Sequence, residues 1–171
     1  MGHARLLTSI DLPIIDTFHD KVIASLEKKY FFLKYTEDER KIFDQEDAML
    51  NLGWFEDDQL CASLGFIKNR EHMCGLADTI LDNSPERKLA MLVHVGALSD
   101  IRKKGLVSKL TSLGLDVLRQ EKFDAIIGAA LGENVESGKY LKRNGFSIVG
   151  SYSHNRPDGI ERTRNVWELT L

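Results

Sequence analysis

Ile101-Arg102-Lys103-Lys104-Gly105-Leu106-Val107-Ser108 is the stretch that decides the fold, because it joins a predicted strand to a predicted helix. Before it, residues 89–98 are apolar or small except for His94, which is typical of a buried strand. After it, apolar residues recur at helical spacing as far as Glu121. They are Leu106, Leu110, Leu113 and Val117. A basic turn that contains glycine therefore lies between a strand and the start of a helix.

This junction has the features of an anion-binding site. Gly105 lets the backbone adopt a conformation, or approach a ligand, where a Cβ would be in the way. Arg102, Lys103 and Lys104 place positive charge beside the helix N-terminus, where unpaired backbone N–H groups already favour an anion. The pattern predicts a cradle for a pyrophosphate. An ordinary strand-to-helix turn with solvated lysines is the alternative that this stretch leaves open.

The composition is that of one globular domain. The chain has 171 residues, of which 43% are hydrophobic and 29% are charged, and its formal net charge is −3. This balance argues against a nucleic-acid-binding protein, and no apolar run approaches the ~20 residues that span a bilayer. No basic-then-apolar signal pattern opens the sequence, so we expect a cytoplasmic protein. Cys61 and Cys74 lack metal-ligand spacing with nearby histidines, so we expect buried or idle thiols and no metal site.

The other predicted elements alternate between strands and helices. Thr36-Glu37-Asp38-Glu39 has the form of a capping box, and Asn144-Gly145 is a typical helix end. Residues 69–88 predict a functional loop or an inserted element, and Pro157-Asp158-Gly159 predicts a turn. Strands are predicted at 5–9, 50–55, 60–67, 124–131, 147–152 and 165–171, and helices at 12–26, after 36, and from 134 to 144.

This order predicts the fold class. It is βααββ, then the stretch at 69–88, and then βαβαββ. We therefore expect an α/β protein with a mixed sheet and helices on both faces of that sheet. The whole chain, residues 1–171, is expected to form a single domain.

Two motifs resemble those of the GNAT superfamily, the acyl-CoA-dependent N-acyltransferases. The pyrophosphate signature of that family, Gln/Arg-x-x-Gly-x-Gly/Ala, corresponds to residues 102–107. Its later pattern, Asn-x-x-Ala…Tyr…Gly-Phe, corresponds to Asn134, Ser137, Tyr140 and Gly145-Phe146. One strand and one helix separate the two motifs. The resemblance is close over residues 89–152 and holds only in outline over residues 1–88.

The resemblance implies a single-domain, mostly antiparallel sheet whose fourth and fifth strands splay apart to admit acetyl-CoA. It divides the chain into an acceptor-side half at 1–88, an acyl-CoA-binding half at 89–152 and closing strands at 147–171. Pantetheine would pair with the fourth strand as a peptide does in β-augmentation. A β-bulge at Gly96 would produce the splay, although that glycine could instead only relieve packing. The residues implied in cofactor binding are Val95, Gly96, Ala97, Leu98, Arg102, Lys103, Lys104, Gly105, Leu106, Val107, Ser108, Asn134 and Ser137.

The sequence departs from the family pattern in four places. Val107 stands where glycine or alanine is usual, and Ser137 replaces alanine. Family members often carry a tyrosine that protonates the departing CoA sulfur, but Leu141 holds that position here and Tyr140 precedes it. Some members place a glutamate base on the fifth strand, where this chain has Ala129. The cofactor site is therefore better supported by the resemblance than the catalytic residues are.

The chemistry implied by the family asks for a base and an acid. A primary amine has a pKa near ~10 and must lose a proton before it attacks a thioester. His94, which alternates with its neighbours so as to face away from Met91, is one candidate base, and Glu133 is the second. Tyr140 is the candidate acid. The alternatives are that His94 is a core or surface histidine, that Glu133 is a solvated glutamate and that Tyr140 only packs. Asn134 has an alternative as well, which is to cap its helix without contacting the cofactor.

We therefore predict an N-acetyltransferase that uses acetyl-CoA as co-substrate and no metal. Its acceptor is expected to be a primary amine of a small molecule, with a protein or peptide amine as an alternative. A non-catalytic acyl-CoA-binding protein and a generic phosphate-binding α/β domain are the rival hypotheses. We expect neither nucleic acid nor a membrane as a partner, and a homodimer is left open.

Overall fold

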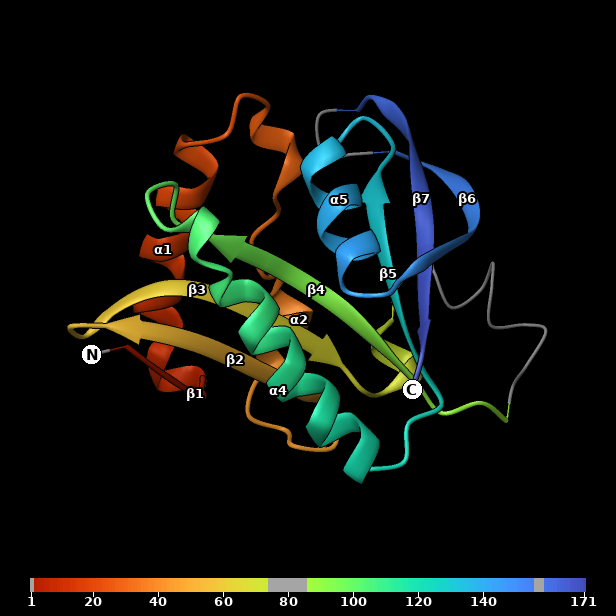
Figure 1. Ribbon diagram of the computed structural model, residues 1–171, viewed down its shortest axis with the longest axis horizontal. Helices are drawn as coiled ribbons and strands as arrows, with labels where there is room; N and C mark the ends of the chain where they lie inside the picture. Colours follow the sequence, from red (N-terminus) through yellow and green to blue (C-terminus); the bar gives the residue numbers. More distant parts are fainter. Residues whose placement is uncertain (1, 74–85, 156–158) are drawn as a thin grey trace.

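Seven strands form one sheet in the order β1-β2-β3-β4-β5-β7-β6. The computed structural model describes residues 2–73, 86–155 and 159–171 (Figure 1). The middle of the predicted excursion, 74–85, and the first two residues of the predicted turn Pro157-Asp158-Gly159 lie outside the described residues. The strands are β1 (His3–Leu6), β2 (Met49–Glu56), β3 (Gln59–Ile67), β4 (Leu89–Ala97), β5 (Ala125–Leu131), β6 (Ser147–Asn155) and β7 (Glu161–Thr170).

Helices cover both faces of this sheet, as predicted (Figure 1). α1 (Leu12–Ala24) and α2 (Glu37–Lys41) lie on one face, and α4 (Leu106–Gln120) and α5 (Val135–Arg143) lie on the other. Short 3₁₀ turns, η1 (Ser9–Asp11), η2 (Lys29–Phe31), η3 (Arg70–His72) and η4 (Arg102–Lys104), join the elements. Among the described residues, no helix is long and apolar enough to cross a membrane.

The local signals placed most helix ends correctly. Thr36 and Glu39 form the predicted capping box, in which the Glu39 N–H donates to Thr36 Oγ1 at 3.2 Å. The first strand, predicted at 5–9, instead occupies His3–Leu6. It ends early because the Thr8 N–H donates to Asp11 Oδ2 at 2.9 Å and turns the chain into α1. The prediction at 5–9 was therefore wrong by two residues at its start and by three at its end.

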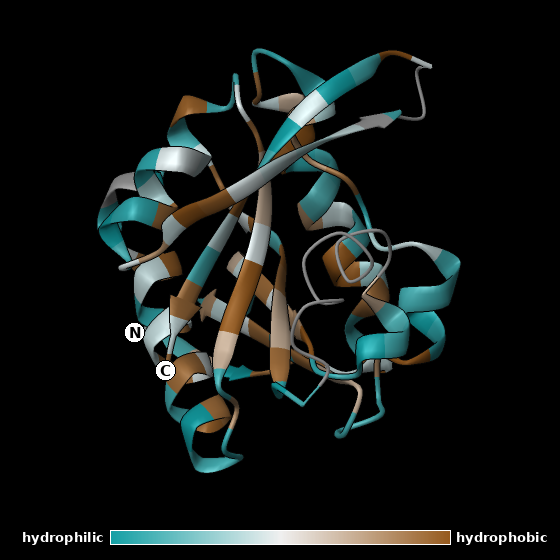
Figure 2. Ribbon diagram, turned by 90° about the vertical axis from the view of Figure 1, so that its right-hand side faces the viewer, coloured by the Kyte–Doolittle hydropathy of each residue, from teal (hydrophilic) through white to brown (hydrophobic). Residues whose placement is uncertain are grey.

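The core lies between the sheet and the helices, and α4 packs closely against it. A Cβ on Gly114 would lie 2.2 Å from the ring of Phe66, so glycine is what lets α4 approach β3. Figure 2 shows hydrophobic residues concentrated in the central strands and polar residues along the outer helix surfaces. Since Phe66 faces α4 and pairs with Leu92, the α4 face of β4 carries Leu92 and the opposite face carries Met91.

β4 and β5 splay apart, which confirms the predicted gap. Their parallel pairing runs only from Leu89↔Ala125 to Leu92↔Gly128. Beyond Leu92 and Gly128 the two strands diverge towards their carboxyl ends (Figure 1). β5 continues instead along β7 as far as Leu131, so the gap is bordered by β4 on one side and by β5 on the other.

A β-bulge on β4 lies beside this gap, but not where the sequence predicted it. The register with β3 shifts between Ser63 and Gly65, so that His94 and Val95 together oppose Leu64. His94 has φ of +51°, a left-handed conformation that is uncommon for a residue with a Cβ. The prediction of a bulge at Gly96 was therefore wrong. Gly96 serves packing, since a Cβ there would lie 3.0 Å from the Phe32 ring.

Candidate active site

Part of the backbone of β4 faces the gap. The Leu98 N–H donates to Cys61 O at 3.0 Å, so Leu98 directs its amide to β3. One residue earlier the Ala97 carbonyl points the other way and accepts from Arg102 Nε at 3.2 Å. Because backbone groups alternate between the two sides of a regular strand, Gly96 shares the side of Leu98. Val95 belongs to the bulge, so its pairing with pantetheine stays a prediction. Of the four predicted pantetheine-binding residues, Ala97 is thus the one whose backbone is shown to be directed away from β3.

The turn that follows β4 ends in an open helix N-terminus. Gly105 is the N-cap of α4, with φ of +70° and ψ of 16°, and an added Cβ would meet no atom within 4 Å. The first N–H groups of an α-helix have no partner inside the helix, so those of Leu106, Val107 and Ser108 point into this space. The side chain of Leu106 is buried and fixes the turn to the core. The predicted cradle therefore exists as a backbone arrangement.

The basic residues of this turn make specific contacts. Arg102 donates from Nη2 to Ser25 Oγ at 2.5 Å, in addition to its bond to Ala97 O, and so ties the end of β4 to the end of α1. Lys104 Nζ lies 3.3 Å from Glu56 Oε2 at the end of β2. Lys103 belongs to the same 3₁₀ turn. In this conformation Arg102 and Lys104 contribute positive charge near the cradle while bound to groups of the protein.

The start of α5 forms the other wall of the candidate site. Asn134 Oδ1 accepts a hydrogen bond from the Ser137 N–H at 3.2 Å, which confirms that Asn134 caps its helix. The Nδ2 group of Asn134 is not used by this cap. Contact of Asn134 or Ser137 with pantetheine stays a prediction.

Tyr140 is held by α4 through its hydroxyl group. Tyr140 Oη lies 2.5 Å from Thr111 Oγ1, and Thr111 in turn donates to Val107 O at 2.7 Å. Since the Thr111 proton is used for Val107, Tyr140 must be the donor to Thr111. Burial raises the pKa of Tyr140 to about 12, although the bond to Thr111 opposes the shift. The neighbouring Leu141 is buried in the core. The hydroxyl is therefore committed to a structural contact in this conformation.

We expect Tyr140→Phe to keep kcat within about threefold of the wild-type value, because only a hydroxyl bound to Thr111 is lost. The free energy of unfolding should fall by about 1 kcal/mol, the usual contribution of one buried hydrogen bond. Steady-state kinetics and urea denaturation measure the two quantities. Thr111→Val is the matched variant, since it breaks the same bond from α4. A fall in kcat of about 100-fold, specific to Tyr140→Phe, would instead identify Tyr140 as the general acid.

His94 is enclosed by hydrogen-bond acceptors. Its Nδ1 lies 2.9 Å from Leu33 O and its Nε2 lies 3.0 Å from Glu39 Oε1. Its ring centroid is 4.0 Å from that of Tyr35. These partners belong to the α1–α2 side of the sheet, which is the face of Met91. The prediction that His94 faces away from Met91 was therefore wrong, because the bulge interrupts the alternation of the strand.

Glu39 belongs to the candidate site, although the sequence identified it only as part of a capping box. Its Oε2 accepts from the Thr36 N–H at 2.7 Å, as the capping box predicted, while its Oε1 binds His94. Burial alone would raise the pKa of Glu39, but the bonds and charge from His94, together with the bonds from Thr36, lower it overall. Nothing in the local sequence places residue 39 beside residue 94.

Glu133 closes a cluster at the open end of the gap. Its carboxylate accepts from Lys28 Nζ at 2.6 Å and from Tyr30 Oη at 3.0 Å, and it lies 3.7 Å from Arg162 Nε. The bonds from Lys28 and then Tyr30 lower the pKa of Glu133. The Arg162 guanidinium also stacks 3.8 Å from the centre of the Tyr30 ring. The cluster therefore connects the α1–α2 segment with the end of β5 and with β7.

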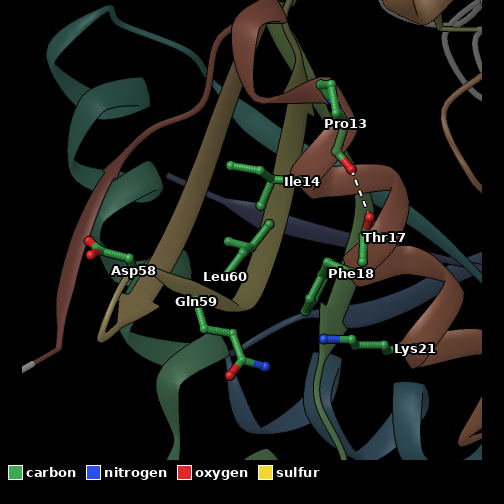
Figure 3. A pocket seen from close by; sticks show the side chains of 8 residues that line it. All are labelled: Pro13, Ile14, Thr17, Phe18, Lys21, Asp58, Gln59 and Leu60. Carbon is green, nitrogen blue, oxygen red and sulfur yellow. Dashed lines mark hydrogen bonds between the residues drawn. The ribbon is translucent and has the colours of Figure 1, made fainter.

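A separate hollow lies between α1 and the β2–β3 turn (Figure 3). Its volume is about 360 Å³, and none of the predicted site residues lines it. Within the described part of the chain, no group of three His, Cys, Asp or Glu side chains could hold a metal ion. The hollow is lined by Pro13, Ile14, Thr17, Phe18, Lys21, Asp58, Gln59 and Leu60.

Comparison with known proteins decides what this arrangement is. The model of the acetyltransferase (GNAT) family matches residues 20–146, most of the chain. The chain belongs to the GNAT acetyltransferase family. No curated protein sequence matches it.

Solved GNAT structures share the fold over almost the whole chain at low sequence identity. A probable acetyltransferase from Staphylococcus epidermidis is 15% identical, with 99% of each chain covered and a TM-score of 0.77. NAA60 from Arabidopsis thaliana in complex with acetyl-CoA is 12% identical, with 100% of this chain and 99% of that chain covered and a TM-score of 0.78. The ribosomal-protein-S18-alanine N-acetyltransferase from Escherichia coli is 16% identical, with 99% and 94% covered and a TM-score of 0.71.

The family and these folds support acyl-CoA-dependent N-acetyl transfer, with acetyl-CoA as the co-substrate. The residues of this GNAT acetyltransferase fit that co-substrate on two observations. The backbone at Gly105 leaves room that a Cβ would occupy, beside unpaired N–H groups that suit a pyrophosphate. Among the described residues, no strand pairs with the gap-side edge of β4 beyond Leu92, so this edge can pair with an extended amide chain.

Proposed function

We propose that this GNAT acetyltransferase transfers the acetyl group of acetyl-CoA to the primary amine of a small molecule. The observation that carries the proposal is the cluster of Lys28, Tyr30, Glu133 and Arg162. It links the α1–α2 segment, which packs on β4, to β5 and β7 on the far side of the gap. We infer that this cross-link leaves less room for an extended polypeptide on the acceptor side of the gap, which favours a compact acceptor.

Donor binding is assigned to the opposite side of the sheet. The N–H groups at the start of α4, from Gly105 to Ser108, are proposed to hold the pyrophosphate, with charge added by Arg102, Lys103 and Lys104. Ala97 and Val95 are proposed to pair with pantetheine. This arrangement fixes the thioester between β4 and β5, where an amine can reach it from the α1–α2 face.

The hydrogen bonds of His94 and Glu133 bear on how the acceptor amine loses its proton. Both ring nitrogens of His94 face acceptors, and Glu133 is bound by Lys28 and Tyr30. We therefore assign positioning roles to His94 and Glu133, and the amine loses its proton to solvent before it attacks. The carbon–nitrogen bond forms as the carbon–sulfur bond breaks, and the nitrogen gives its remaining extra proton to solvent. The thiolate leaves without an obligatory acid because a thiol has a pKa near ~8.5.

Acetyl-CoA at ~100 times its dissociation constant should stabilise the protein by about 2.7 kcal/mol. A thermal-shift titration measures this, and mass spectrometry of a panel of small amines and peptide N-termini then identifies the acceptor class. An unchanged melting temperature in millimolar acetyl-CoA, with a known acetyltransferase as positive control, would refute the assignment of the donor site.

A non-catalytic acyl-CoA-binding protein is the second candidate. It is favoured by one observation, that Tyr140, His94 and Glu133 all have their polar groups engaged. Stabilisation by acetyl-CoA without acetylation of any amine in the panel would support that candidate.

A further inference from the structure

Arg164 is a cation on β7 that projects from the α1–α2 face of the sheet, the face from which the amine is proposed to enter. A Cβ on Gly138 of α5 would lie 3.7 Å from Trp167 Cζ2, so Trp167 faces α5. Side chains alternate along β7, whose pairing with β5 is regular, so Arg162 and Arg164 project from the opposite face. The contact of Arg162 with Tyr30 of the α1–α2 segment agrees with this direction. Arg164 pairs with Leu131, in the part of β5 that borders the gap.

The Arg164 guanidinium is only partly satisfied by the protein. Its Nη1 donates to Tyr152 Oη on β6 at a long 3.4 Å. Its Nε is fully buried and has no hydrogen-bond partner among the described residues. Within the part of the chain that the structure describes, no carboxylate pairs with Arg164. A buried, unpaired guanidinium nitrogen is costly, because the charge has lost water without gaining an anion.

The neighbouring charges are already paired with one another. Glu133 is occupied by Lys28, Tyr30 and Arg162, and Glu39 is occupied by His94 and Thr36. At the other end of the same face of β7, Glu168 binds Arg87 through two hydrogen bonds. Arg164 therefore adds a positive charge to this face of the sheet that no carboxylate of the described residues neutralises.

We propose that the acceptor amine carries a carboxylate group, which Arg164 binds. The substrate class is then an amino acid or a related amine that carries a carboxylate, and not a polyamine, which Arg164 would repel. The planar guanidinium suits a carboxylate because it offers parallel N–H donors, which an ammonium group does not. This inference rests on the proposed function and specifies the acceptor of that same site.

The test compares matched acceptors that differ only in the carboxylate. Free amino acids and their amides, together with O-phosphoethanolamine and spermidine, are assayed for acetylation by wild-type protein, Arg164→Gln and Arg164→Lys. Arg119→Gln is the control, since Arg119 is an exposed arginine on α4 paired with Asp116. We expect wild-type protein to favour an acid over its amide at least about 10-fold in kcat/KM, the value of one charged hydrogen bond. Arg164→Gln should abolish this preference by raising KM for the acid, and Arg164→Lys should restore part of it.

Two outcomes overturn the proposal. One is equal or better use of amides, spermidine or the phosphate-bearing amine by the wild type, and the other is an equal loss on acids and amides in Arg164→Gln. If no amine is acetylated, a thermal shift caused by amino acids in the presence of CoA, and lost in Arg164→Gln, supports the proposal; no shift refutes it. Because the thermal shift with acetyl-CoA alone is measured on every variant, a failure of donor binding is seen separately.

Discussion

Gly105→Val is expected to weaken acetyl-CoA binding by at least about 100-fold while the protein stays folded. Gly105 has φ of +70°, where a β-branched residue is strained, so the turn must leave this conformation. The first N–H groups of α4 would then no longer converge on one point. Losing two charge-assisted hydrogen bonds, at about 1.5 kcal/mol or more each, corresponds to this decrease in affinity. Isothermal titration calorimetry measures the affinity, and circular dichroism checks the fold.

Two further substitutions separate backbone strain from crowding. Gly105→Ala tolerates the left-handed backbone at lower cost and meets no protein atom, so we expect a loss of only about 10-fold. Gly159→Val is the matched control, since Gly159 also has a positive φ of +74° and open surroundings but lies in the β6–β7 connection. A folded Gly105→Val protein whose affinity is within about threefold of wild type would show that the pyrophosphate binds elsewhere.

The donor half of the site could be predicted from the sequence because its signals are local. The strand before Arg102, the glycine at 105 and the helix after it are adjacent in the chain, and their patterns depend on backbone preferences that need no tertiary context. The gap between β4 and β5 followed from the resemblance, and the structure confirms it. The bulge could not be located in this way, because a bulge depends on the register between β3 and β4 and not on the composition of either strand.

The proposed acceptor half could not be predicted, because it depends on contacts between residues that are far apart in the chain. Glu39 meets His94 across 55 positions in the chain, and Lys28 meets Glu133 across 105. Contacts of this kind depend on how α1, α2 and the sheet pack, which hydrophobic periodicity does not encode. In the sequence, Arg164 is an ordinary residue of an alternating strand pattern. Only the contacts of its neighbours show that no anion among the described residues pairs with it.

His19 lies in the same half and should make the stability of the protein depend on pH. It is fully buried on α1, and both ring nitrogens lack a hydrogen-bond partner among the described residues. Its ring packs against Phe32 and Tyr35, with centroids 4.8 and 5.3 Å away. Burial, and secondarily the charge of His94, lowers the pKa of His19 to about 3. The imidazole of His19 is therefore neutral in the folded protein between pH 7.5 and pH 5.

We expect the free energy of unfolding to fall by about 2 kcal/mol between pH 7.5 and pH 5 through His19 alone. In the unfolded chain His19 has its ordinary pKa near ~6.5 and binds a proton as the pH falls below that value. The folded state does not bind that proton until the pH approaches the lowered pKa. The stabilisation is therefore complete above the unfolded pKa and is lost as the pH falls from there towards the folded one.

Urea denaturation at half-unit pH intervals measures this slope, and His19→Phe should remove it, because phenylalanine suits the aromatic surroundings and does not titrate. His3→Asn is the matched control, since His3 is exposed on β1 and its replacement should leave the slope unchanged. The carboxylates whose pKa is lowered, Asp11 and Glu39 among them, affect stability only at lower pH, so they do not mask the effect. An identical pH dependence in wild type and His19→Phe would mean that His19 is protonated in the fold or reached by water. A slope lost only in His19→Phe would establish that the proposed acceptor side of this GNAT acetyltransferase contains a neutral imidazole next to His94.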